Sequence, residues 1–147
     1  MRGDISRQAF VRGALGAAAG VLLGSCRAAV AAPPDWSALD DSIEGQVILP
    51  SSADYAAAKN LFNSRFDNST PAAVVTVKSA DDVQKAVAFA AKKGVKVASR
   101  SGGHSYIGAS AANSAMVIDL RQLPGGITYD DGSGLAAISA AADLDSV

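Results

Sequence analysis

The chain has 147 residues, of which 49% are hydrophobic and 18% are charged. This composition excludes an intrinsically disordered chain, which needs low hydrophobicity and high net charge. The net charge of −1 and the pI near 5.7 weigh against a nucleic-acid-binding protein. The single cysteine excludes an internal disulfide framework and a Cys-rich zinc site, and the single histidine excludes a metal site with several histidine ligands.

The first 31 residues have the layout of an export signal. Arginines at positions 2, 7 and 12 precede an apolar run at 14–23 and an alanine-rich stretch at 28–32. The apolar run is about half the ~20 residues that a membrane-spanning helix needs. We therefore expect an exported protein, periplasmic or secreted, with no transmembrane span in the mature chain.

Two export routes fit this segment. Residues 6–12 resemble a twin-arginine motif in which Gln8 replaces the second arginine, and residues 23–26 resemble a lipobox in which Cys26 would be lipidated. The alternative is that cleavage follows Ala31 and discards Cys26 with the signal. The small residues around Ala31 favour this alternative.

The rest of the chain divides into an approach segment at 32–66 and a domain at 67–147. A short apolar patch at 46–49 predicts an edge strand within the approach segment. Residues 53–62 are predicted to form a helix, because apolar side chains recur there at helical spacing. A polar loop is expected to follow.

A strand, a helix and a strand then form a βαβ unit. The run at 72–77 is β-branched and almost continuously hydrophobic, which indicates a strand that is buried on both faces. The helix at 79–94 has a capping serine and a terminal glycine. Its predicted apolar face consists of Val83, Val87 and Ala90, with Ala86 and Phe89 alongside. A strand at 95–98 completes the unit, and the predicted fold class is α/β (α+β).

Three further strands are predicted at 115–119, 127–129 and 135–140. An Asp- and Gly-rich hairpin turn at 130–134 joins the last two. No capped element follows them, so we expect an incomplete domain.

A glycine-rich loop follows the second strand of the βαβ unit. Adjacent glycines allow successive backbone N–H groups to converge on a phosphate, and α/β sheets bind ligands at the carboxyl ends of their strands. The spacing excludes a P-loop and a Rossmann fingerprint, but it leaves a generic glycine-rich turn open. The candidate binding residues are Arg100, Ser101, Gly102, Gly103, His104, Ser105 and Gly108.

Two of these candidates have alternative roles. His104 is either a packing or surface residue, or a nucleophile or hydrogen-bond donor to a bound anion. Arg100 either adds a fixed positive charge or holds the loop itself.

Residues 100–105, Arg-Ser-Gly-Gly-His-Ser, resemble the pyrophosphate loop of FAD-binding domains of the vanillyl-alcohol-oxidase or p-cresol-methylhydroxylase (PCMH) type. Within that type, the berberine-bridge-enzyme-like (BBE-like) oxidases are the most similar group. The resemblance runs from about Gly45 to Val147. It implies the N-terminal part of a PCMH-type FAD-binding domain.

The resemblance also implies a function, that of an FAD-dependent oxidoreductase. His104 matches the histidine that such enzymes commonly link to the 8α carbon of the flavin, and residues 101–105 would lie along the FAD pyrophosphate. Family oxidases pass a hydride from a small-molecule substrate to the flavin, which O₂ reoxidises to release hydrogen peroxide. The implied substrate is a sugar, an alcohol or an amine, and the catalytic base is unknown.

Three departures from the family pattern bear on activity. The only cysteine is Cys26, so no second flavin link through a cysteine exists in these residues. Residues 140–147 replace a glycine-rich stretch that relatives usually have, and family members are several times longer. We do not expect catalysis by this chain alone, and the alternative function is a non-catalytic exported module or an inactive truncated gene product.

Overall fold

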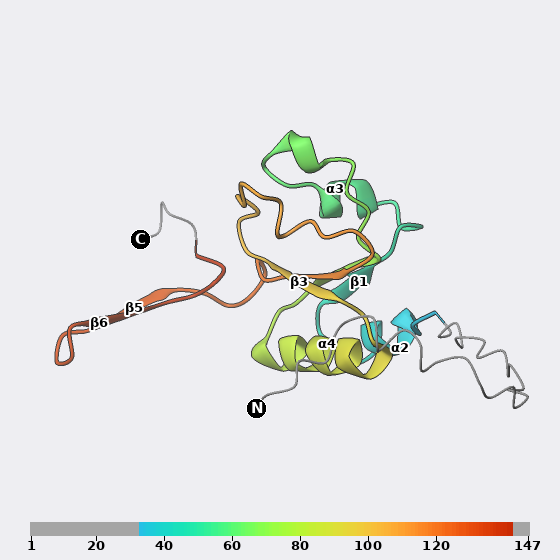
Figure 1. The fold of residues 1–147 in the computed structure, drawn as a ribbon. Helices are drawn as coiled ribbons and strands as arrows, with labels where there is room; N and C mark the ends of the chain where they lie inside the picture. Colours follow the sequence, from blue (N-terminus) through green and yellow to red (C-terminus); the bar gives the residue numbers. More distant parts are fainter. Residues whose placement is uncertain (1–32, 143–147) are drawn as a thin grey trace, which may run out of the picture. The chain divides into compact units, whose positions relative to one another are not determined.

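The computed structural model describes residues 33–142, and the export signal predicted for residues 1–31 lies outside them. The described part holds a four-stranded sheet and a separate two-stranded sheet (Figure 1). Its elements, in chain order, are α2 (Trp36–Asp40), β1 (Gln46–Ile48), α3 (Tyr55–Lys59), a 3-10 turn (Ser64–Phe66), β2 (Ala73–Thr76), α4 (Ala80–Lys93), β3 (Val97–Arg100), β4 (Met116–Asp119), β5 (Ile127–Asp130) and β6 (Leu135–Ile138). No helix among these is long and apolar enough to cross a membrane.

The larger sheet has the strand order β1-β2-β4-β3. Strands β2, β4 and β3 run parallel, and β1 pairs antiparallel with β2 at one edge, which confirms the predicted edge strand and the βαβ unit. Strand β4 lies between the two strands of that unit. The register places Arg100 of β3 opposite Asp119 of β4, so the carboxyl ends of these strands lie side by side.

Both faces of the central strands are buried, as the hydrophobic run at 72–77 predicted. Val75 packs in a cluster with side chains of α2 and α4, and Val74 packs in a second cluster with Ala58 of α3. Figure 1 shows α2 and α4 on one side of the sheet and α3 on the other. Each valine is fully buried, which contributes about 1.5–3 kcal/mol to folding.

The ends of α4 are those that the sequence predicted. The Ser79 hydroxyl accepts a hydrogen bond from the Asp82 amide at 3.1 Å, which satisfies one of the free N–H groups of the first turn. The helix ends at Gly94, whose φ of 66° lies in the left-handed region that favours glycine.

The buried face of α4 includes Ala86 and Ala90, as predicted, but it also includes Asp82 and leaves out Val87, which is 48% exposed. The reason is that the Asp82 carboxylate accepts hydrogen bonds from three backbone amides, those of Glu44, Gly45 and Lys78. These bonds turn Asp82 inward, against the chain that leads into β1, and a hydrophobicity pattern alone does not indicate them.

The helix predicted at 53–62 is also wrong in extent, because α3 ends at Lys59. Asn60 has an extended backbone conformation. The Lys59 ammonium donates hydrogen bonds to the carbonyls of Asp67 and Ser69, which brings the following loop back toward α3. The 3-10 turn lies inside the loop predicted after the helix.

The strand predicted at 95–98 begins two residues later, at Val97. The Val95 amide still donates to the Ala90 carbonyl of α4 at 2.9 Å, so the exit from the helix occupies the residues before the strand. This shift brings Arg100 from the predicted loop into β3.

Strands β5 and β6 form the predicted hairpin, although β6 ends at Ile138 rather than at residue 140. The Asp130 carboxylate organises the turn, since it accepts hydrogen bonds from the Gly132 amide at 3.0 Å and the Ser133 hydroxyl at 2.7 Å. Both strands are exposed along their length.

Candidate functional site

The glycine-rich loop leaves the carboxyl end of β3 and returns to the sheet as β4. It passes over the face that α3 covers, where Ala112 packs with Ala58 against the second core cluster (Figure 1). The site is therefore built where the carboxyl ends of parallel strands meet a short helix, a common position for ligand binding in α/β sheets.

Gly102 and Gly103 form an open backbone cradle. Gly103 is buried and has a φ of 74°, and a Cβ atom there would lie 3.4 Å from Leu61 Cδ2. Within residues 33–142, the amides of Gly102, Gly103 and His104 donate no hydrogen bond. Free amides on a left-handed glycine turn are the feature that binds anions such as phosphate.

His104 projects from this cradle and is exposed. Its ring stacks on Phe62, with ring centroids 4.3 Å apart and an interplanar angle of 21°. Both rings line a cavity of about 350 Å³, whose lining residues are Phe62, Asn63, Ser64, His104, Ser105 and Tyr106. His104 is therefore an exposed residue that stacks on an aromatic ring beside a cavity, and both of its alternative roles stay predictions.

Phe62 is a site residue that the sequence reasoning missed. The helical spacing placed it on the apolar face of a helix, whereas it lies beyond the end of α3 and is 77% exposed. The available signal is Lys59 followed by Asn60, because a basic residue in the last turn and an asparagine directly after it mark the end of a helix.

Arg100 lies under the loop. It is 2% exposed, and its Nη2 atom donates hydrogen bonds to the Ala58 carbonyl at 2.5 Å and to Asp119 Oδ2 at 2.7 Å. Of the two roles open to Arg100, these contacts support the one in which it holds the loop.

Asp119 is the second residue that sequence reasoning missed, because nothing local marks it as a partner of Arg100. Its carboxylate also accepts hydrogen bonds from Arg121, including one from Nη2 at 2.6 Å. Burial raises the pKa of Asp119, but the hydrogen bonds from Arg121 and Arg100 outweigh it and hold that pKa below its ordinary value.

The remaining candidates shape the loop. The Ser105 hydroxyl accepts a hydrogen bond from the Ala109 amide at 3.0 Å, and the Ser101 hydroxyl donates to the Ala140 carbonyl. Gly108 has a φ of 69°, and a Cβ atom there would lie 2.6 Å from Phe66 Cδ1. A side chain at position 108 would thus force the loop away from the 3-10 turn.

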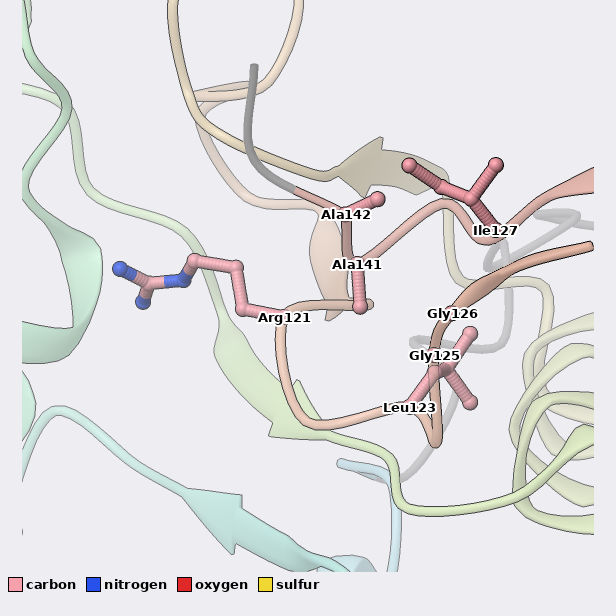
Figure 2. Close-up of a pocket in the computed structure, with 7 residues that line it drawn as sticks. All are labelled: Arg121, Leu123, Gly125, Gly126, Ile127, Ala141 and Ala142. Carbon is pink, nitrogen blue, oxygen red and sulfur yellow. The ribbon is translucent and has the colours of Figure 1, made fainter. Parts of the chain in front are cut away.

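A second cavity, of about 450 Å³, lies beside the entrance to β5. Figure 2 shows its lining residues, Arg121, Leu123, Gly125, Gly126, Ile127, Ala141 and Ala142. The Arg121 side chain points away from the two glycines in this view, and it is bound to Asp119. The cavity contains none of the candidate residues from the sequence.

Known proteins match the part of the chain that contains the glycine-rich loop. Residues 71–147 match the family model described as an FAD binding domain. The chain is 35% identical over 80 residues to (R)-6-hydroxynicotine oxidase of Paenarthrobacter nicotinovorans, covering 54% of this chain and 17% of that protein. It is 33% identical over 98 residues to a carbohydrate oxidase of Microdochium nivale, covering 65% of this chain and 20% of that protein.

The fold has matches among solved structures. The structure of wild-type BBE-like 1 from Physcomitrella patens aligns with a TM-score of 0.62 at 25% identity, covering 69% of this chain and 22% of that one. This chain spans about a fifth of the length of these relatives.

Proposed function

The chain belongs to the FAD-binding domain family, among proteins of the PCMH and BBE-like type, and we propose that it supplies the flavin-anchoring part of an exported FAD-dependent oxidoreductase. The observation that carries the proposal is the position of His104. It extends from a glycine cradle whose amides have no acceptor within residues 33–142, and it lines a cavity together with Phe62.

The described residues fit FAD in two respects. The amides of Gly102 and Gly103, which have no acceptor within residues 33–142, lie on a turn with a left-handed glycine and suit the charge of a pyrophosphate. The cavity beside His104 has the volume of a small-molecule site, for which about 300–1,000 Å³ is usual, and its aromatic walls suit a flat ring system.

We assign roles to the residues of this chain accordingly. Residues 101–105 would hold the pyrophosphate through backbone amides. An imidazole nitrogen of His104 would replace one hydrogen of the flavin 8α carbon, which leaves the flavin reduced by two electrons until O₂ reoxidises it. Bound flavin supplies reversible uptake of an electron pair from substrate. Phe62 limits the rotation of the His104 ring by stacking on it, which keeps the imidazole plane fixed for attachment.

The family relatives support a proposal for the substrate and the electron acceptor of the complete activity. The relatives named above are a 6-hydroxynicotine oxidase and a carbohydrate oxidase. We propose that this protein oxidises a small sugar, alcohol or amine and passes the electrons to O₂, with release of hydrogen peroxide. A cofactor bound covalently to the protein suits an exported enzyme, because it cannot be lost by dilution.

Export itself is part of the proposal and rests on the sequence of residues 1–31. Determination of the mature N-terminus after expression in a bacterial host tests it. A mature chain that starts at Ala32 supports a cleaved signal, a lipid-modified Cys26 supports a lipoprotein, and an intact Met1 on intracellular protein contradicts export.

The flavin link is tested on a denaturing gel. The chain is expressed with riboflavin supplied, separated under denaturing conditions, soaked in acid and viewed under ultraviolet light. A fluorescent band that the His104→Ala variant lacks supports attachment at His104. A band of equal intensity in the variant contradicts it, and the Ser110→Ala variant serves as a control for substitution within the same loop.

A flavin-free band from the wild-type chain favours the alternative, a non-catalytic exported module or an inactive truncated gene product. Equilibrium dialysis of the purified chain against FAD then separates the two functions. The measured quantity is the amount of FAD that the protein retains. If the wild-type chain retains no more FAD than the Gly103→Val variant, the result contradicts a pyrophosphate cradle.

A further inference from the structure

We propose that Arg100 is a positioning residue for His104, because it joins α3 to the glycine-rich loop and thereby sets the stacked geometry of Phe62 and His104. The geometric part of this inference is independent of flavin. Its consequence for flavin attachment rests on the proposed function.

The first link runs from Arg100 to the loop. Arg100 is 2% exposed, and a Cβ atom on Gly103 would lie 3.7 Å from Arg100 Cδ and 4.0 Å from Cγ. The aliphatic stem of Arg100 therefore supports the buried Gly103, directly before His104.

The second link runs from Arg100 to the segment that carries Phe62. The Nη2 atom donates to the Ala58 carbonyl at 2.5 Å, near the end of α3. Leu61, three residues further on, faces the loop, since its Cδ2 atom lies 3.4 Å from where a Cβ atom on Gly103 would be. Phe62 then stacks on His104 at 4.3 Å. The Arg100 side chain thus lies against both the loop that carries His104 and the segment that carries Phe62.

Arg100 is one of two cations on Asp119, since Arg121 donates to both carboxylate oxygens through Nε and Nη2. The bond to the Ala58 carbonyl is the contact of Arg100 that reaches α3. Within residues 33–142, Nε and Nη1 of Arg100 are buried without a hydrogen-bond partner, which is unfavourable. The positioning role of Arg100 therefore rests on the bond to Ala58, while its bond to Asp119 connects β3 to β4.

Proton NMR of His104 tests the inference without flavin. His104 is the only histidine in the chain, so its ring protons are assigned by the His104→Ala variant. The stacked Phe62 ring displaces them upfield, and the Phe62→Leu variant measures that displacement. We expect Arg100→Met to lose more than half of it.

Arg121→Met is the matched control, because it removes a cation from the same carboxylate but contacts neither Ala58 nor Gly103. It is expected to keep the wild-type displacement. A folded Arg100→Met variant with wild-type His104 signals would overturn the inference. If Arg100→Met does not fold, the Arg100→Lys variant is measured instead. Loss of the upfield displacement of the His104 ring protons in that variant supports the inference, and a displacement equal to that of the wild-type chain overturns it.

The consequence for attachment is measured separately. On incubation with FAD, Arg100→Lys is expected to form the covalent bond about 10–100-fold more slowly than Arg121→Met, the range that small misplacements of a reacting group produce. If the wild-type chain takes up no flavin, the proposed function fails. The NMR comparison still decides the role of Arg100.

Discussion

The Arg100 guanidinium and the Asp119 carboxylate lie 2.7 Å apart at the carboxyl ends of two adjacent parallel strands, and both side chains are almost fully buried. A buried ion pair is a weak source of net stability, because both charges leave water. Its effect here is geometric, since it fixes the last residue of β3 against the last residue of β4. The glycine-rich loop begins directly after Arg100 and returns to the sheet at Met116, the first residue of β4.

Removing one member of this pair should be strongly destabilising. Asp119→Asn leaves the Arg100 guanidinium buried without a counter-charge, and we expect the free energy of unfolding to fall by about 3–5 kcal/mol. Urea denaturation measures this change. Arg121→Met is the control, because Arg121 is half exposed, and its loss should lower the free energy of unfolding by only about 0–1 kcal/mol. Equal losses in the two variants would contradict the assignment of Asp119 as the central acceptor.

The ionised Asp119 carboxylate also predicts that the free energy of unfolding falls at acid pH. The pKa of Asp119 is lower in the folded chain than its ordinary value, despite burial, because Arg121 and Arg100 donate hydrogen bonds to the ionised form. A lowered folded pKa gives stability that is fully present above the unfolded carboxyl pKa of about 4 and is lost as pH falls through the folded pKa. The urea midpoint should therefore stay level from pH 7 to about 5 and fall below about 4. A midpoint that rises on acidification would contradict this sign.

Asp82 should be essential for the attachment of β1. Its buried carboxylate accepts hydrogen bonds from the amides of Lys78, Glu44 and Gly45 at 2.9, 2.9 and 3.1 Å. Asp82→Ala leaves these amides without their partner, and a loss of at least about 3 kcal/mol in the free energy of unfolding is expected.

Asp81→Ala is the matched control for Asp82 on the same turn of α4. Asp81 is exposed and pairs only with Lys85, four residues further along the helix, so its loss should be about 0.3–0.5 kcal/mol. Hydrogen exchange should also show faster exchange at the Glu44 and Gly45 amides in the Asp82→Ala variant. Protection of both amides in that variant would disprove the role of Asp82.

The sequence was sufficient to predict those features of the fold that depend on neighbouring residues alone. The βαβ unit follows from a hydrophobic run, from the cap at Ser79 and from the stop at Gly94, all of which are properties of neighbouring residues. The glycine cradle is local for the same reason, since adjacent glycines open the backbone wherever they occur.

The contacts that complete the site are not local. Arg100 reaches Ala58 across 42 residues and Asp119 across 19 residues, and neither distance is determined until the register of β3 and β4 is fixed. Phe62 was assigned to a helix face because the apolar spacing continues past Lys59, whereas the chain turns back there. Side chains that act through such long-range contacts have no signature in periodicity or spacing.

A comparison of alanine substitutions at Gly108 and Gly94 distinguishes the cost of backbone strain from the cost of a steric clash. Both have positive φ angles, 69° and 66°, but only Gly108 faces a neighbour, the Phe66 ring, whereas nothing lies within 4 Å of a Cβ atom on Gly94. Gly94→Ala should lower the free energy of unfolding by about 1–2 kcal/mol, the penalty for a left-handed alanine. Gly108→Ala should lower it by a further 1–3 kcal/mol or so, because the methyl group overlaps the Phe66 ring.

A double-mutant cycle between Gly108→Ala and Phe66→Ala isolates the steric part. Removal of the ring should recover the additional loss, so that the two substitutions together are less destabilising than the sum of their separate effects by about 0.5–3 kcal/mol. Gly94→Ala combined with Phe66→Ala should be additive, because the two positions share no contact. Additivity at Gly108 as well would mean that the loop does not rest on Phe66, and that backbone strain alone explains the glycine.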